Sequence, residues 1–71
     1  MKNTYTKSAE NLAKAVKEHR KRLGLSQEAF ADEAGIDRTY VSQIERGIAN
    51  PSLSVIAKIA DVFKIAIKDL L

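Results

Sequence analysis

Five polar side chains share one face of a helix that we predict over residues 37–46. At about 100° per residue they fall within one arc, whereas Val41 and Ile44 point to the other side. The five are Arg38, Thr39, Ser42, Gln43 and Arg46, and none is acidic. Arginine can bond a guanine edge bidentately, glutamine an adenine edge, and a threonine methyl can pack on thymine. This face therefore predicts contacts with DNA base edges; an ordinary amphipathic helix with a polar outer face is the alternative.

The composition leaves little room for catalysis or a metal site. The chain has 71 residues, no cysteine and a single histidine, His19, so disulfides and His/Cys zinc sites cannot be built. We expect His19 to be exposed or close to a phosphate. No pair of catalytic groups converges, so we predict that the protein is not an enzyme and needs no cofactor. The longest apolar run is three residues, which argues against a membrane span or signal peptide and makes a cytoplasmic location the expectation.

Positive charge is concentrated at the start of the chain. The net charge is +3 and the pI about 9.4, but residues 1–25 hold seven Lys or Arg against two acids, whereas residues 26–47 hold two against five. Part of the early charge falls on one helical face, at Lys14, Lys17, Lys21 and Arg22. This face is either solvated, which we favour, or in contact with DNA. The net charge is too small to attract DNA by itself, so a DNA-binding surface would depend on where the positive side chains lie.

Helical periodicity runs through the chain and no stretch alternates at period two, so the predicted fold class is all-α. The first four predicted helices are each bounded by a glycine or by a candidate N-cap, whereas the last is preceded by Ala66, a poor cap. The glycines are Gly24, Gly35 and Gly47, and the caps are Ser26, Asp37 and Ser52. The predicted helices cover residues 8–23, 27–34, 37–46, 52–63 and 67–71. Residues 1–7 are expected to form a disordered tail before one domain at 8–71, although Lys2 and Lys7 could form a minor-groove arm.

Only residues 35–37 separate the second and third predicted helices. So short a connection forces the helices to cross steeply, which is the geometry of a helix-turn-helix. Such a turn can project the polar face of the third helix into a major groove.

The run from Leu25 to Gly47, LSQEAFADEAGIDRTYVSQIERG, followed by Asn50-Pro51-Ser52-Leu53 and Ile59-Ala60, resembles the Cro/repressor-type helix-turn-helix family. Within this family the chain looks most like controller proteins of bacterial restriction–modification systems. The resemblance implies a compact five-helix bundle of the lambda-repressor-like type, a homodimer, and binding to double-stranded DNA at a two-fold symmetric operator. We expect no membrane partner, because the apolar runs are short, and no small-molecule site is evident.

The resemblance also implies roles for individual residues. Base edges would be read by Arg38, Thr39, Gln43 and Ser42. Phosphates would be held by Gln27, Arg46, Asn50, Ser52 and Tyr40, although Tyr40 could equally pack at the edge of its helix. Arg20 and Glu45 would form a structural ion pair.

Excess apolar surface predicts a dimer from the residues themselves. On the helix over 52–63, Val55 and Val62 widen an apolar stripe to which Leu53 also belongs, until its arc exceeds what one small domain can cover. The last predicted helix adds further apolar positions. We therefore predict a two-fold interface built on Val55, Val62, Ile67, Leu70 and Leu71. The alternative is that the last helix folds back and closes the core of one chain.

A protein-interaction module that uses the same helices, such as an antitoxin, is the other function open to this sequence. The acid-free face of the third helix favours DNA, because a module that only wraps a protein partner does not need it.

Overall fold

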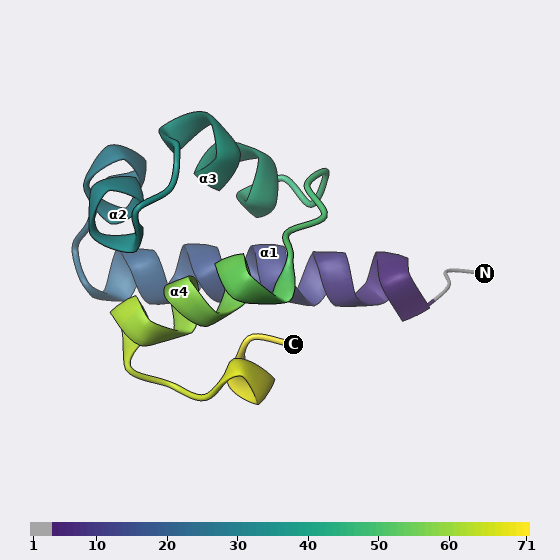
Figure 1. Cartoon of the computed structure of the whole chain (residues 1–71). Helices are drawn as coiled ribbons and strands as arrows, with labels where there is room; N and C mark the ends of the chain where they lie inside the picture. The colour runs from purple at the N-terminus through teal and green to yellow at the C-terminus, as the bar shows by residue number, and fades with distance from the viewer. Residues whose placement is uncertain (1–3) are drawn as a thin grey trace.

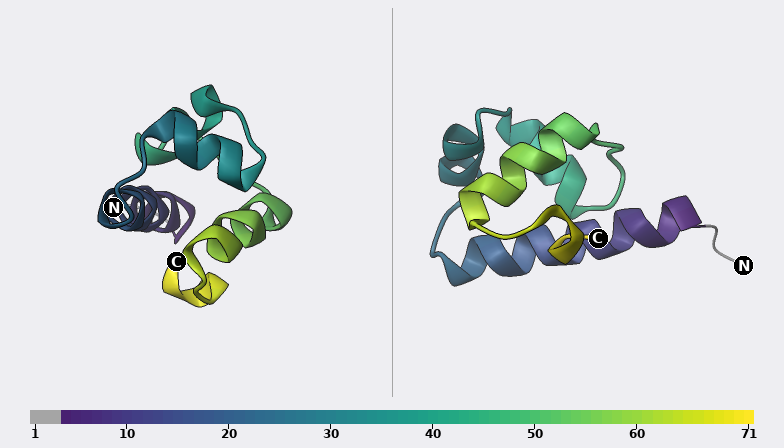
Figure 2. Two further views of the ribbon diagram at one scale, coloured as in Figure 1. Left: turned by 90° about the vertical axis from the view of Figure 1, so that its left-hand side faces the viewer. Right: turned by 60° about the horizontal axis from the view of Figure 1, so that its bottom comes forward.

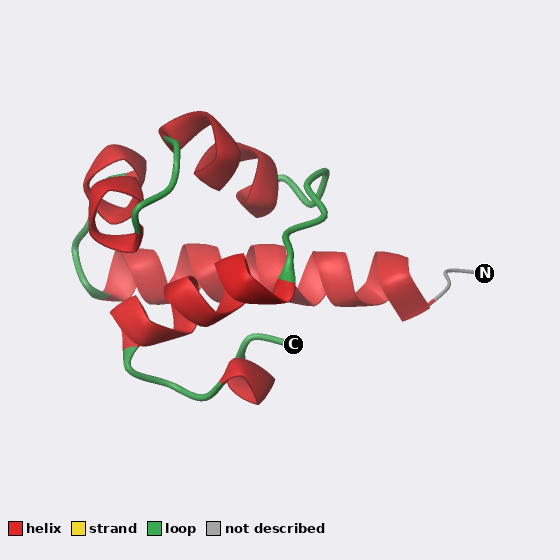
Figure 3. Ribbon diagram, in the orientation of Figure 1, coloured by secondary structure: helices red, strands yellow, loops and turns green. Residues whose placement is uncertain are grey.

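A computed structural model describes residues 4–71, with side chains from residue 7 onward. Four α-helices follow one another, and a short 3-10 helix closes the chain. They are α1 (Thr4–Arg22), α2 (Gln27–Ala34), α3 (Arg38–Glu45), α4 (Leu53–Phe63) and η1 (Ile67–Asp69). The described residues are all helix and loop, as Figure 3 shows, which confirms the predicted all-α class.

The long helix α1 packs against α3 and α4. α2 contacts both α3 and α4, and the 3-10 helix contacts α4 (Figure 1). The view along α1 shows α2 and α3 on one side of the core and α4 with the C-terminal segment on another (Figure 2). The largest fully buried side chains come from every α-helix and from the C-terminal segment. They are Phe30, Ile44, Ile59, Leu70, Val16 and Val41.

The predicted caps set most helix boundaries. Ser26 and Ser52 precede α2 and α4, and their hydroxyl oxygens accept hydrogen bonds from the amides of Ala29 and Val55, at 3.0 and 3.2 Å. Gly35 ends α2 in the left-handed conformation, at φ 71°, which glycine adopts without strain. Asp37 stands at the N-cap position of α3, as predicted, but its side chain makes no cap hydrogen bond. The prediction that this side chain caps the helix was therefore wrong.

The bounds of α1 and the apolar position Leu53 differ from the prediction. α1 begins at Thr4, four residues before Ser8, so residues 4–7 are helical; Met1–Asn3, with Lys2, lie outside the described residues. α1 ends at Arg22, one residue before the predicted end, so Leu23 lies in the turn at Gly24 and is 54% exposed. Leu53 is 67% exposed at the first turn of α4, so it is not part of the core stripe.

The predicted fifth α-helix is a 3-10 turn, so the bundle has four α-helices among the described residues. The Asp69 carboxylate accepts a hydrogen bond from the Ala66 amide at 3.2 Å, and the Leu70 amide bonds the Ile67 carbonyl at 2.9 Å. These i→i+3 contacts tighten the segment into a turn. The turn folds back and places Leu70 in the core, where it is 1% exposed.

None of the helices in the described part of the chain has the length and apolar character needed to cross a membrane.

Candidate nucleic-acid interface

The polar face of α3 points away from the bundle. Val41 and Ile44 are buried at 0 and 1% exposure, and they fasten the opposite side of the helix to α1 and α2. Of the predicted base-reading residues, Arg38 and Thr39 are exposed and Ser42 and Gln43 are half-buried. In Figure 1, α3 lies on the far side of the molecule from the 3-10 turn, with α1 beneath it. The four side chains therefore share one accessible face, as the periodicity predicted.

Tyr40 lies elsewhere on α3. Its ring is half-buried and packs against the core, and it lines a shallow hollow with Ala31, Gly35 and Val55. Of the two roles that the sequence left open for Tyr40, this placement favours packing over a phosphate contact.

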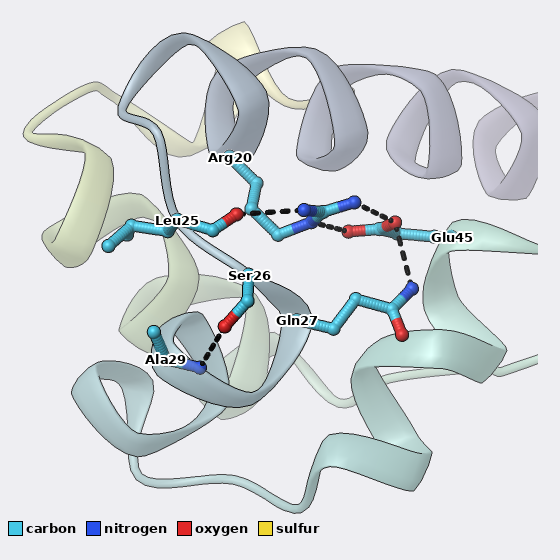
Figure 4. A network of polar contacts seen from close by, with 6 residues as sticks. All are labelled: Arg20, Leu25, Ser26, Gln27, Ala29 and Glu45. Carbon is cyan, nitrogen blue, oxygen red and sulfur yellow. Dashed lines mark hydrogen bonds and ion pairs between the residues drawn. The ribbon is translucent and has the colours of Figure 1, made fainter.

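Arg20 on α1 and Glu45 at the end of α3 form an ion pair with little solvent around it. Arg20 Nε lies 2.6 Å from Glu45 Oε2, and Nη2 donates to Oε1 at 3.0 Å, so the contact is bidentate. The side chains are only 11 and 4% exposed. The remaining guanidinium nitrogen, Nη1, donates to the Leu25 carbonyl at 2.8 Å. One arginine thus holds α1, the α1–α2 loop and α3 together (Figure 4).

The environment keeps both members of this pair charged. Burial alone raises the pKa of the Glu45 carboxyl. Hydrogen bonds from Arg20 and Gln27, with the charges of Arg20 and Lys17, outweigh it and bring the pKa below its usual value of 4.5. The hydrogen bond to Glu45 raises the pKa of Arg20 despite the opposing effect of burial. Lys17 is exposed and precedes Arg20 by three positions on α1, so the two residues share the side of the helix that faces α3.

Gln27 has a partner that the sequence did not predict. Its Nε2 donates to Glu45 Oε1 at 3.1 Å, so the first residue of α2 is tied to the last residue of α3. The side chain remains half-exposed at the start of α2, where backbone N–H groups and the helix dipole favour an anion.

The segment after α3 carries the other predicted phosphate contacts. Arg46 and Asn50 are exposed, and Gly47 turns the chain at φ 75°. The Ser52 hydroxyl oxygen is used as a cap for α4, which leaves its hydrogen available to donate. Asn50 also borders a small notch of about 80 Å³ with Leu12, Ile56 and Leu71.

Of the five predicted interface residues, Leu70 is inaccessible and the other four are at least partly accessible. Leu70 is buried in the core of a single chain at 1% exposure, so it cannot contact a partner, and its assignment to the interface was wrong. The C-terminal segment thus folds back and closes the core of one chain, which is the alternative to the predicted interface. Val55, Val62 and Ile67 are half-buried against the same core, and Leu71 is 49% exposed.

Three further contacts were missed by sequence reasoning. His19 stacks on Phe63 with ring centroids 5.0 Å apart, and Phe63 stacks on Phe30 at the same distance. Asn11 Nδ2 donates to the Leu71 carbonyl at 3.2 Å. None of these pairs is close in sequence, and only the apolar position of Phe63 on its helix was a signal that it faces the core.

The four α-helices and the outward face of α3 define a helix-turn-helix protein. The chain belongs to the helix-turn-helix family HTH_3, whose profile matches residues 16–70. It is 49% identical over 47 residues to the control protein C.BamHI of Bacillus amyloliquefaciens, a match that covers 66% of this chain and 58% of that protein. Other relatives, from Archaeoglobus fulgidus and Bacillus subtilis, are named as HTH-type transcriptional regulators.

Solved structures share the fold. The restriction-modification controller protein C.AhdI from Aeromonas hydrophila superposes with a TM-score of 0.83 at 38% identity, over 89% of this chain and 96% of that one. The biofilm regulator SinR, solved in complex with DNA, gives a TM-score of 0.79 at 32% identity, over 83% of this chain and 95% of that one.

Proposed function

We propose that this protein is a sequence-specific DNA-binding transcriptional regulator that places α3 in a major groove. The observation that carries the proposal is the acid-free polar face of α3, which the buried Val41 and Ile44 turn outward behind a three-residue turn. Arg38, Thr39, Ser42 and Gln43 present on this face the donors, acceptors and methyl group that discriminate base edges.

The proposed phosphate contacts lie beside the polar face of α3. Gln27 begins α2 and is bonded to Glu45 at the end of α3, and Arg46, Asn50 and Ser52 belong to the segment that follows α3. Contacts of this kind fix the register of α3 on the duplex without carrying sequence information. The exposed Lys17 is either solvated or a further contact to the DNA backbone, because it shares a side of α1 with Arg20, the partner of Glu45.

We also propose that the protein acts as a homodimer on a two-fold symmetric operator. One α3 makes few base contacts, whereas a dimer places two of them about 34–36 Å apart in successive major grooves. Four of the predicted interface residues are at least partly accessible on α4 and the C-terminal segment, and they suit a self-complementary contact. They are Val55, Val62, Ile67 and Leu71.

The likeness to C.BamHI and C.AhdI supports a controller protein of a restriction–modification system, or a small repressor, acting in the cytoplasm. Selection of bound duplexes from a random DNA pool tests this function. We expect enrichment of a motif with two-fold symmetry, and a retained complex that weakens steeply as salt rises, because bound Lys and Arg release condensed counterions. No DNA retained even at low salt would contradict the proposal and favour the protein-interaction module.

A further inference from the structure

Glu45 has two partners with different roles. The Arg20 guanidinium engages both carboxylate oxygens, at 2.6 and 3.0 Å, and so already balances the charge. Oε1 nevertheless accepts a second hydrogen bond, from Gln27 Nε2 at 3.1 Å. The ion pair joins α1 to α3, whereas the second bond reaches Gln27 at the start of α2 (Figure 4).

The second bond fixes which way the Gln27 amide faces. An ionised carboxylate can only accept hydrogen bonds, so the amide must turn its nitrogen toward Glu45. Figure 4 shows the Gln27 oxygen directed away from the carboxylate. The nitrogen carries two hydrogens, and Glu45 takes one, which leaves one N–H for an anion.

A glutamine held in this way is ordered before DNA arrives. An exposed glutamine has several rotamers, and fixing one of them on binding reduces affinity. Glu45 is itself fixed, because it is bound bidentately and its side chain is 4% exposed. The rigid pair therefore restrains Gln27 in the free protein.

We infer that Glu45 is a positioning residue for the DNA contact of Gln27, in addition to being the partner of Arg20. This inference rests on the proposed function only in assuming that Gln27 meets a phosphate. Glu45 thereby raises affinity for DNA of any sequence without touching the duplex. A purely structural Glu45 would join α1 to α3 and leave the contribution of Gln27 to binding unchanged.

A double-mutant cycle separates these two roles. Gln27→Ala is made in the natural chain and in a background carrying Arg20→Met and Glu45→Leu, which removes both charges together so that neither is left buried alone. Affinity is measured by fluorescence anisotropy with a random-sequence duplex at low salt, after circular dichroism has shown that the background is folded. We expect Gln27→Ala to weaken binding less in the background than in the natural chain, by a factor of roughly two to ten. If Gln27→Ala weakens binding by the same factor in the natural chain and in the background, the inference is wrong.

A second measurement needs no variant. In the free natural protein, the 15N relaxation of the Gln27 side-chain amide should show restricted motion, with Gln43 on the reading face of α3 as the matched comparison. A Gln27 amide as mobile as that of Gln43 overturns the inference even if the background does not fold. Failure of every variant and of the natural chain to bind any duplex would overturn the proposed function itself. Binding with no coupling would overturn only the role of Glu45.

Discussion

His19 stacks on Phe63, with ring centroids 5.0 Å apart and planes 26° from parallel, and so ties the last turns of α1 to the end of α4. Phe63 also stacks on the fully buried Phe30, so the histidine extends an aromatic column that begins in the core. The single histidine is thus a packing residue, and it is half-buried where we had expected it to be exposed or near a phosphate.

Replacing His19 with alanine should lower the free energy of unfolding by about 1 kcal/mol, since a stacked ring pair contributes about that much beyond its buried area. Urea denaturation measures this loss. Glu18→Ala, at the neighbouring exposed position, is the control and should change stability by no more than about 0.5 kcal/mol. Equal losses in the two variants would show that the stack contributes nothing.

Because of the Arg20–Glu45 ion pair, we expect the free energy of unfolding to decrease in acid. The pKa of Glu45 is lower in the folded protein than its usual 4.5, so the ionised carboxylate contributes its full stabilisation above pH 4.5. This stabilisation is lost as the pH falls through the lower pKa of the folded protein. Glu45→Gln should lower stability at pH 7 by roughly 3–5 kcal/mol, because Arg20 is left buried without its counter-ion.

Thermal melting from pH 7 down to pH 3 checks both statements. The natural chain should lose more stability over this range than the Glu45→Gln variant, which has no carboxyl to protonate at this site. Parallel pH profiles for the two proteins would contradict the assigned role of the pair.

Arg38→Ala should weaken binding to the selected operator by about 1–3 kcal/mol and relax the preference at one base pair of each half-site. Gln27→Ala is the matched control, because loss of a phosphate contact should weaken cognate and random duplexes alike. Competition binding with both duplexes measures the difference. If Arg38→Ala lowered affinity for both by the same factor, Arg38 would be a phosphate contact.

Lys64 follows α4 in the left-handed conformation, at φ 58°, and is the one described non-glycine residue with positive φ. This conformation is unfavourable for a side chain with a Cβ by about 1–2 kcal/mol. Lys64→Gly should therefore stabilise the protein by about 1 kcal/mol, as seen by an increase in melting temperature. Lys58→Gly, inside α4, should instead destabilise it by about 1 kcal/mol.

The proposed dimer can be tested at two positions that differ only in burial. Leu71 is 49% exposed, so Leu71→Asp should give a folded monomer with weaker operator binding. Leu70 is 1% exposed, so Leu70→Asp should unfold the chain, because an unpaired charge would enter the core. Analytical ultracentrifugation with circular dichroism distinguishes these outcomes. A Leu71→Asp protein that remains dimeric would place the interface elsewhere, for example on α1.

Much of this fold could be read from local sequence. The bounds of α2 match the prediction, and those of α3 and α4 agree closely with it, because a capping residue and a positive-φ glycine act within a few positions of themselves. The division of α3 into an apolar face and a polar face also follows from helical periodicity alone. The Arg20–Glu45 pair, 25 positions apart, was implied only by the family resemblance.

Other features were decided by which elements lie side by side. A helical wheel gives the angle of a side chain but not what covers it, so it could not show that Leu70 closes the core while Leu53 stays exposed. The partners of His19 and Gln27 come from other helices and leave no local pattern. The sequence by itself thus determined where α2, α3 and α4 lie and which side chains form the polar face of α3. Only the packing of α1 against α3 and α4 decided how that face is held, because long-range contacts depend on the assembled core.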